Sequence, residues 1–187
     1  MTERIRVPAA YRTASAKAPR GVEGGQFTAE LSGEESVLFL VGMRINRLRR
    51  IRSWWPAFVG MPRMLKELES HPEAGLLGHR NFVSGRVLMS VQHWRSAEDL
   101  GRYARNPELA HHPAWGAFNK AVAGSGDVGV FHETYQVGTD SFETLYGNMP
   151  LFGLAAAHQL SARGSRRSRT RTRDRLGQQD PEYVEAS

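Results

Sequence analysis

Residues 36–46 read SVLFLVGMRIN, and this stretch decides the fold. It is rich in large apolar and β-branched side chains and is bounded by Ser32 and Gly33 on one side and a basic cluster on the other, which predicts a buried strand. Both faces of the strand are apolar in its first half. Polar groups enter late, at Arg44 and Asn46, and these two share one face because side chains alternate along a strand.

Periodicity and capping signals predict the elements that follow. Apolar residues three and four apart predict a helix that ends at His71 and Pro72, with Pro62 in its first turn. Ser96, with Asp99 three residues later, is close to a capping box and predicts the start of a second helix. Strands are expected at 76–84, 86–94 and 127–137, with a tight turn at 84–85 and a further helical stretch at 107–123.

The resulting order is β-α-β-β-α-β, which predicts an α+β, ferredoxin-like fold. In this split βαβ pattern two helices cover one face of a four-stranded antiparallel sheet. The other face would be apolar whichever face the helices take. It would carry Phe39 or Leu40, Leu88 or Met89, and Val130 or Phe131. Because a large apolar face is not left in water, we expect two copies to pair sheet to sheet as a homodimer.

Composition divides the chain into three parts. Residues 1–25 are rich in Ala, Arg and Ser and lack periodicity, so we interpret them as a disordered leader, with a transit peptide as the alternative. Residues 26–158 are expected to form the folded domain. Residues 159–187 are interpreted as a disordered, arginine-rich tail.

Charge, cysteine content and hydropathy limit the partners. The net charge is +6, and residues 163–175 contain seven arginines and one aspartate, so the rest of the chain is neutral overall. Such a tail contacts polyanions without reading their sequence, and no specific nucleic-acid partner is expected. No run of 18 apolar residues is present, so no membrane span is expected. The lack of cysteine fits a cytoplasmic protein without disulfides.

Six segments together resemble a known family. They are VLFLVGMRIN (37–46), MPRMLKEL (61–68), VQHWRSAEDLGRYAR (91–105), HHPAWGAFNKAV (111–122), SGDVGVFHETY (125–135) and YGNMPLFGL (146–154). In this order they resemble a family catalogued as a domain of unknown function and likened to the fungal fumagillin-pathway monooxygenase. That family belongs to the dimeric α/β-barrel superfamily, with the antibiotic-biosynthesis monooxygenases.

The resemblance implies a dimeric α/β barrel with a pocket between the sheet and helices of each protomer. Some relatives oxidise apolar metabolites with O₂ and no cofactor, whereas haem-degrading enzymes, chlorite dismutases and aldoxime dehydratases bind haem. Fold alone does not select among these chemistries. We expect a small oxygenase acting on an apolar secondary metabolite. The alternatives are a haem enzyme of the same superfamily and a module that binds an apolar ligand without turnover.

His111 is the first candidate for chemistry. At helical spacing it shares an apolar stripe with Trp115 and Phe118. In haem-degrading relatives a helix histidine after a strand-end tryptophan ligates iron, and the spacing from Trp94 through Tyr103 to His111 is similar. The resemblance therefore implies His111 as an axial haem ligand. Acid/base work, substrate contact and a purely structural histidine stay open as alternatives.

His132, Arg44 and Asn46 complete the expected catalytic set. His132 is a second candidate base, and it points away from Glu133 on the last strand. Arg44 or Asn46 would stabilise a developing oxyanion, since relatives use an asparagine on the first strand to orient substrate or O₂. The alternative for Arg44 is an ion pair with Glu133, because a buried glutamate needs a partner.

Aromatic and methionine side chains are the expected substrate contacts, because they suit a flat apolar ligand. With one strand-end histidine, they are Trp54, Met61, Met64, His93, Trp94, Tyr103, Trp115, Phe118 and Tyr135. Core packing is the alternative role for these side chains. The sequence contains no phosphate-binding glycine loop and no closely spaced metal-ligand motif, so the expected cofactor is none or haem.

Overall fold

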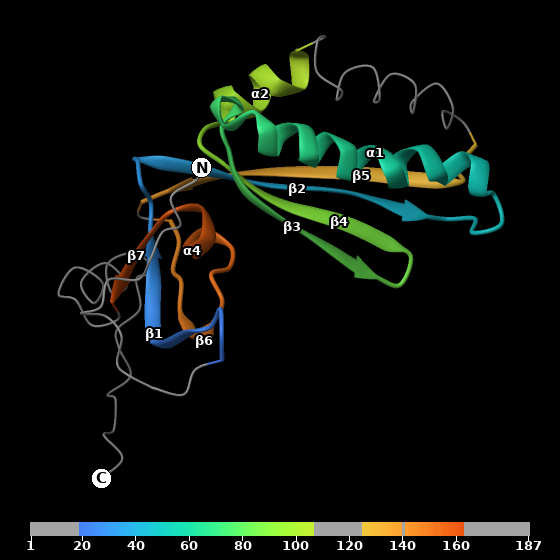
Figure 1. Ribbon diagram of the computed structural model, residues 1–187. Coiled ribbons are helices and arrows are strands. Elements are labelled where there is room, and N and C mark those ends of the chain that lie inside the picture. Colours follow the sequence, from blue (N-terminus) through green and yellow to red (C-terminus); the bar gives the residue numbers. More distant parts are fainter. Residues whose placement is uncertain (1–18, 107–124, 140, 163–187) are drawn as a thin grey trace. The chain divides into compact units, whose positions relative to one another are not determined.

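The computed structural model describes residues 19–106, 125–139 and 141–162. The chain divides into two compact units (Figure 1). The central unit is Glu35–Gln136, and the flanking unit combines Met1–Glu34 with Val137–Ser187.

The central unit contains a four-stranded sheet with strand order β3-β4-β2-β5. Its strands are β2 (Glu35–Ile45), β3 (Leu76–Ser84), β4 (Val87–Trp94) and β5 (Val128–Gly138), and its helices are α1 (Ile51–Ser70), the 3-10 turn η2 (Pro72–Ala74) and α2 (Ala97–Arg105). The first and fourth strands of this unit, β2 and β5, are neighbours, as the split βαβ pattern requires. The predicted ferredoxin-like α+β fold is confirmed. The helical stretch expected at 107–123 lies outside the described residues.

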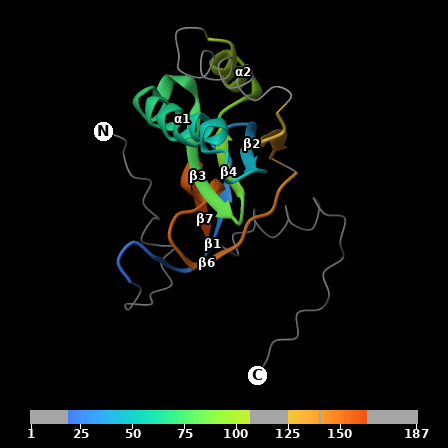
Figure 2. The same cartoon turned by 90° about the vertical axis from the view of Figure 1, so that its right-hand side faces the viewer.

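The central sheet has two different faces. Val37 of β2 packs in one cluster with Leu68 of α1 and Tyr103 of α2, and Ile45 packs in a second cluster with Trp54 of α1. Odd-numbered residues of β2 therefore point toward the helices, and even-numbered residues point to the other side. We call these sides the helix-facing side and the open face. Figures 1 and 2 show α1 lying along one side of the sheet.

Helix α1 begins earlier than expected. It starts at Ile51, so Pro62 is in its interior rather than its first turn, and Pro56 is also inside the helix. An interior proline costs about 3 kcal/mol because it removes a backbone hydrogen bond and crowds the preceding turn. Packing opposes this cost along the whole helix, since Leu65 is buried in its second half and Trp54 packs against the sheet in its first.

The predicted hairpin and the second helix are both present. Strands β3 and β4 pair in antiparallel register, with Ser84 opposite Val87, so Gly85 begins the connecting turn and adopts a positive φ of 57°. Ser96 caps α2, because its side chain accepts a hydrogen bond from the Asp99 backbone N at 3.1 Å. Both features can be predicted from the sequence because each depends on a few adjacent residues.

The flanking unit contains a second sheet with strand order β6-β1-β7. Its elements are β1 (Glu23–Glu30), β6 (Tyr146–Met149), α4 (Leu154–Ala157) and β7 (Gln159–Ala162). Its core contains Phe27 and Ala155, and the ring of Phe27 stacks on Tyr146 with centroids 5.1 Å apart. The strands reach beyond residues 26 and 158, the limits expected for the folded domain. Two of these strands have only four residues, too few to show a clear alternation in sequence.

No helix within the described ranges is long and apolar enough to cross a lipid bilayer.

Candidate functional site

A row of four side chains crosses the helix-facing side of the central sheet, with one residue from each strand. His79 of β3 is directly opposite Gln92 of β4, and Gln92 is directly opposite Phe39 of β2. Phe39 contacts His132 of β5, with ring centroids 5.9 Å apart. Directly opposed residues share a face of the sheet, and Phe39 packs with the cluster under the helices. This helix-facing row therefore sets two imidazoles and an amide beside an apolar layer.

Buried polar groups extend the row along β4. Ser90 is 2% exposed and Gln92 is 4% exposed. Gln92 Nε2 donates a hydrogen bond to Ser90 Oγ at 3.4 Å, and Gln92 Oε1 accepts one from Trp94 Nε1 at 2.9 Å. These bonds offset the cost of burying polar groups and fix which way the amide points. Ser90 and Gln92 thus form a small buried polar group, the Gln92 anchor, within an otherwise apolar layer.

A carboxylate of α1 holds one histidine of the row. His79 Nε2 lies 3.1 Å from Glu69 Oε1. The other ring nitrogen, Nδ1, is buried and has no hydrogen-bond partner among the described residues. A carboxylate at one ring nitrogen favours the tautomer that carries its proton there, which leaves the other nitrogen as an acceptor.

His132 is placed apart from its two expected catalytic partners. It is exposed on the helix-facing side, whereas Arg44 lies on the open face because it is an even-numbered residue of β2. Arg44 Nη1 donates to Asn46 Oδ1, and Asn46 Nδ2 donates to Gly126 O at 3.0 Å. Asn46 thus ties the end of β2 to the start of β5. The sheet separates the base His132 from both expected oxyanion-stabilising groups.

The expected ion pair between Arg44 and Glu133 does not form within the part of the chain that the structure describes. Both side chains belong to exposed residues, so neither needs the other to offset burial. Glu133 instead accepts a hydrogen bond from the hydroxyl of Tyr135. That hydrogen bond raises the pKa of Tyr135, since it stabilises the protonated phenol beside a negative charge. Tyr135 lies on the open face with Glu133.

The expected substrate contacts on β4 and α2 occupy different sides of the sheet. His93 is buried on the open face, directly opposite Leu38. Trp94 and Tyr103 are buried on the helix-facing side, with ring centroids 5.6 Å apart. Burial raises the pKa of the Tyr103 hydroxyl well above its ordinary value. Trp94 and Tyr103 therefore supply buried aromatic surface beside Gln92.

The remaining expected contacts lie on α1 or outside the described residues. Trp54 packs on the cluster of Met43 and Ile45, and its Nε1 donates to Leu48 O at 3.0 Å. Met61 and Met64 are half-buried on the same helix. Residues outside the described ranges are His111, Trp115 and Phe118.

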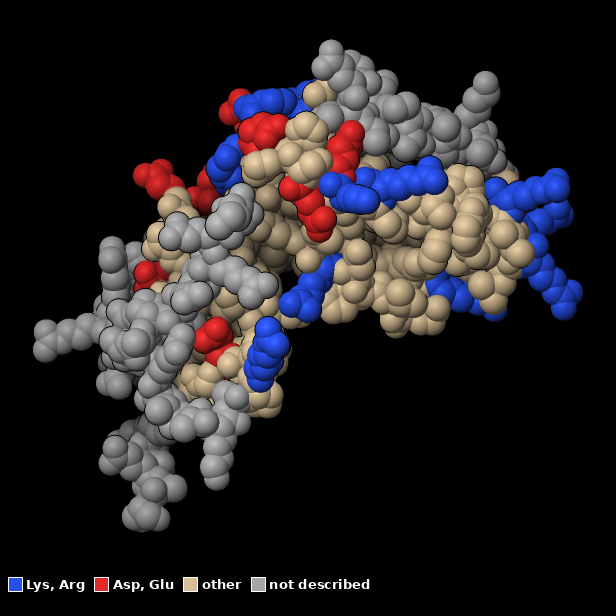
Figure 3. Space-filling view, in the orientation of Figure 1, with Lys and Arg blue, Asp and Glu red and all other residues tan. Residues whose placement is uncertain are grey.

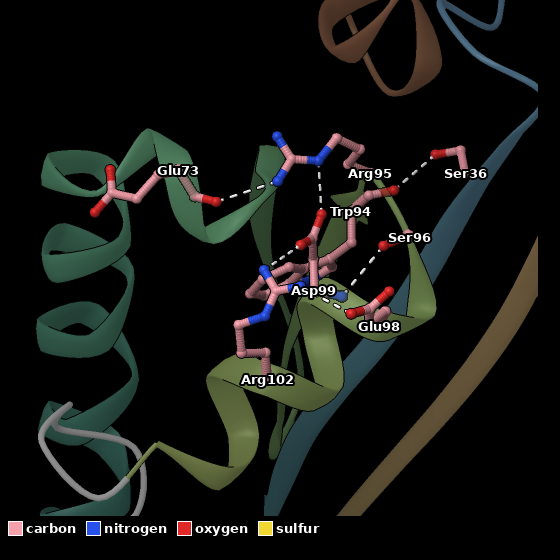
Figure 4. Close-up of polar contacts among 8 residues, drawn as sticks. All are labelled: Ser36, Glu73, Trp94, Arg95, Ser96, Glu98, Asp99 and Arg102. Carbon is pink, nitrogen blue, oxygen red and sulfur yellow. Dashed lines mark hydrogen bonds and ion pairs between the residues drawn. The ribbon is translucent and has the colours of Figure 1, made fainter.

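A buried carboxylate fixes the end of β4 beside this layer (Figure 4). Asp99 accepts hydrogen bonds from Arg95 Nε at 2.6 Å and from Arg102 Nη1 at 2.9 Å. The hydrogen bond from Arg95 lowers the pKa of Asp99 most, with further lowering by Arg102 and Ser96. Arg95 Nη2 also donates to the backbone O of Glu73 at 3.1 Å. The network joins η2, the end of β4 and α2.

Arginines gather at the other end of the central unit, where β2 leads into α1 (Figure 3). Arg47, Arg49 and Arg50 are exposed there. Asp127 accepts from Arg47 Nη1 at 2.8 Å and from Ser53 Oγ at 2.9 Å, and its pKa is lowered mainly by the Ser53 hydrogen bond. This carboxylate joins the start of α1 to the start of β5.

The sequence alone did not mark Ser90, Gln92 or His79 as functional residues. Each has an ordinary polar side chain without a motif around it. The available signal was strand parity, since Ser90 and Gln92 alternate with Val91 and share a face with Trp94. No group of three or more His, Cys, Asp or Glu side chains in the described ranges is arranged to hold a metal ion.

Comparison with known proteins gives one family and several similar structures. The family model "Monooxygenase af470-like" matches residues 36–154. No curated protein matches the chain. A structure of aldoxime dehydratase (OxdRE) in complex with butyraldoxime is similar at TM-score 0.55 and 16% identity, and the match covers 81% of this chain but only 43% of that enzyme.

Two smaller structures also match. SnoaB, a cofactor-independent oxygenase from Streptomyces nogalater, has TM-score 0.39 and 13% identity, over 54% of this chain and 91% of SnoaB. A protein of unknown function from Bacteroides thetaiotaomicron, described as a possible oxidoreductase, has TM-score 0.38 and 18% identity, over 56% of this chain and 99% of that protein.

Proposed function

The chain belongs to the monooxygenase af470-like family, and from this premise we propose that it is a small oxygenase of the antibiotic-biosynthesis-monooxygenase type. Its substrate would be an apolar secondary metabolite bound between the sheet and the helices. The observation that carries the proposal is the match of residues 36–154 to the family model. The polar groups on the helix-facing side of the sheet support the location.

The helix-facing layer has the composition that an apolar ligand needs. Phe39, Trp94 and Tyr103 supply apolar and aromatic surface, and Gln92 and Ser90 supply buried polar anchors. Sites for small molecules combine these two features, because apolar area gives affinity and a few polar groups give orientation.

In the proposed reaction a base removes a proton from an electron-rich substrate, so that the resulting anion reacts directly with O₂. Of the residues expected from the sequence, His132 is the candidate base on the helix-facing side, with His111 as the second candidate. Gln92 and Ser90 are the hydrogen-bond donors available to a developing oxyanion on this side. Arg44 and Asn46 lie on the open face, so we assign them no part in this reaction.

We further propose that the enzyme is a homodimer formed through the open face. The apolar residues of this face in the central sheet include Leu38, Leu40, Phe82, Met89, Val91 and Phe131. Large apolar side chains on a sheet face are costly in water, and a second copy of this chain would cover them with the same apolar residues.

A haem enzyme is the second candidate, and the similarity in fold to aldoxime dehydratase favours it. For a haem, the resemblance implies His111 as the axial ligand, and His111 lies outside the described residues. A bound haem would supply the redox or Lewis-acid centre, and we assign no reaction step to it.

Oxygen uptake tests the oxygenase proposal. With a panel of polyphenols and terpenoids and a metal chelator present, we expect O₂ consumption that His132→Ala reduces at least tenfold, as the loss of a general base does. The matched control is His71→Ala, an exposed histidine away from the row. Binding without O₂ consumption would favour the module that binds an apolar ligand. A Soret band after hemin addition, lost in His111→Ala, would favour the haem enzyme.

A further inference from the structure

Building on the proposed function, we propose that Glu69 and His79 form a carboxylate–histidine pair whose Nδ1 accepts a proton from a weakly acidic hydroxyl of the bound ligand. His79 would touch the ligand, and Glu69 would be a positioning residue that acts through the imidazole. The ligand class is a phenol or an enol, held beside Gln92 in the helix-facing row.

The pair has an outer end and an inner end. The Glu69 side chain is 62% exposed, whereas the His79 side chain is 20% exposed and its Nδ1 is buried. Glu69 Oε1 lies 3.1 Å from His79 Nε2. The carboxylate therefore contacts the ring from its solvent side and favours a proton on Nε2, which leaves the lone pair of the buried Nδ1 as the acceptor.

The nearest polar side chains in register with His79 bond to one another instead of to its ring. Gln92 is directly opposite His79, yet its amide bonds Ser90 and Trp94. A buried acceptor with no hydrogen-bond partner is costly and uncommon in folded proteins. A ligand hydroxyl between His79 and Gln92 would donate a hydrogen bond to this nitrogen. The unpaired acceptor is therefore a candidate ligand contact.

The proton transfer is balanced within the pair and the ligand. The ligand O–H bond breaks, an N–H bond forms at His79 Nδ1, and the electron pair stays on the ligand oxygen. The imidazolium so formed lies beside the Glu69 carboxylate, which offsets its charge. The ligand anion is more electron-rich than the neutral hydroxyl compound and reacts more readily with O₂, so the pair serves the proposed oxygenase.

The chain provides its own control. His71 Nδ1 lies 2.8 Å from Glu73 Oε1, so it is also a histidine–carboxylate pair. Its side chains are 47% and 72% exposed, and it follows α1 rather than lying on the sheet. His71→Gln is therefore the matched control. If proton transfer is specific to the helix-facing row, it is lost in His79→Gln and kept in His71→Gln.

The test uses 4-nitrophenol, whose absorption band separates its neutral and ionised forms. The full chain is mixed with the probe at a pH where the free probe is mostly neutral. We expect an ionised band from bound probe in the wild type and in His71→Gln, and its loss in His79→Gln. Glu69→Gln is expected to lower the ionised fraction severalfold while probe affinity changes little, since the carboxylate beside the imidazolium is removed.

The tautomer of His79 gives a second measurement that needs no ligand. With ¹⁵N-labelled histidine, the wild type is expected to show an unprotonated Nδ1 and a protonated Nε2, and Glu69→Gln is expected to weaken that preference. A protonated Nδ1, or a probe that stays neutral on the wild type or ionises equally on His79→Gln, would overturn the proposal. Probe ionisation without O₂ uptake by any panel compound would leave the pair standing and count against the oxygenase.

Discussion

The carboxylate of Asp99 is 5% exposed, yet it pairs with the guanidinium of Arg95, which is 54% exposed, at 2.6 Å. The buried member of the pair thus depends on the exposed one for its charge balance. Asp99 also accepts a hydrogen bond from Arg102, so two guanidinium groups hold this buried carboxylate.

Asp99→Asn is expected to lower the free energy of unfolding by about 1–3 kcal/mol at pH 7, because charge-assisted hydrogen bonds are lost and a buried polar group loses partners. The folded state holds the pKa of Asp99 below its ordinary value. The stabilisation is therefore full above that ordinary value and is lost as the pH falls through the lowered one.

Urea unfolding of both proteins at pH 7 and at pH 3 checks this prediction, and the difference between them should shrink at the lower pH. Glu98→Gln is the control, because Glu98 is 81% exposed in its pair with Arg102 and should contribute less than about 1 kcal/mol. Equal effects of the two substitutions would contradict the assigned role of Asp99.

Gly75→Ala is expected to be more destabilising than Gly85→Ala. Both glycines have positive φ, 93° and 57°, so both substitutions strain the backbone by about 1 kcal/mol or more. Only at Gly75 would the added Cβ also meet Asp99, 2.6 Å from Oδ2, whereas no atom lies within 4 Å at Gly85. Thermal unfolding of the two variants measures the difference, and equal melting temperatures would argue against the close approach of Asp99.

Gly42→Ala is expected to separate two strands of the central sheet. A Cβ on Gly42 would lie 2.5 Å from the backbone O of Leu88 and 2.7 Å from the ring of Phe131. The carbonyl oxygen cannot rotate away, so the predicted loss of stability is about 1–3 kcal/mol, as for overpacked cores. Gly129→Ala is the matched control, since its nearest neighbour would be Asn46 Nδ2 at 3.7 Å. Denaturant unfolding of both variants measures the two losses of stability. Equal losses would contradict the close contact at Gly42.

Phe82→Glu is expected to disrupt the proposed homodimer, whereas Val83→Glu is not. The two residues are adjacent on β3, and their side chains point to opposite sides of the sheet. Phe82 is opposite Met89 on the open face, and Val83 is opposite Leu88 on the helix-facing side and is 72% exposed. Light scattering after size-exclusion chromatography measures the mass. A monomeric wild type would refute the dimer. If both variants stay dimeric, the interface does not include the open face at Phe82.

The flanking unit is expected to lose stability in mild acid through His158. Burial lowers the pKa of His158, and its Nδ1 accepts a hydrogen bond from the Ser32 backbone N at 3.3 Å. Since the unfolded chain binds the proton more readily, stability falls as the pH drops from the ordinary histidine pKa of about 6.5 through the lowered value.

Amide hydrogen exchange of Phe27 and Ala29, which lie in the same unit, can follow this loss between pH 7.5 and 5.5. His158→Gln should be less stable at the higher pH but should show a smaller pH effect. If the variant loses stability with falling pH as much as the wild type does, His158 is not the group responsible.

Local features of the sequence predicted most of the central fold. The Ser96 cap, the hairpin turn at Gly85 and the apolar stretch at 36–46 each depend on residues adjacent in the chain, so a pattern can reveal them. The predicted start of α1 at Pro62 is wrong, because the packing of Trp54 on the sheet, a tertiary effect, outweighs the preference of proline for the first turn of a helix. The three-stranded flanking sheet was missed because it joins β1 to strands more than one hundred residues later.

The sequence by itself determined the ferredoxin-like order of strands and helices and the family of this protein. Only the tertiary structure decided which side chains share a site, because the register between strands sets the face on which each residue lies. Register placed His132 on the helix-facing side and Arg44 on the open face, although both had been expected in one site. It also set His79 opposite Gln92, and the packing of α1 brought Glu69 to His79, a contact between residues ten apart that no motif records.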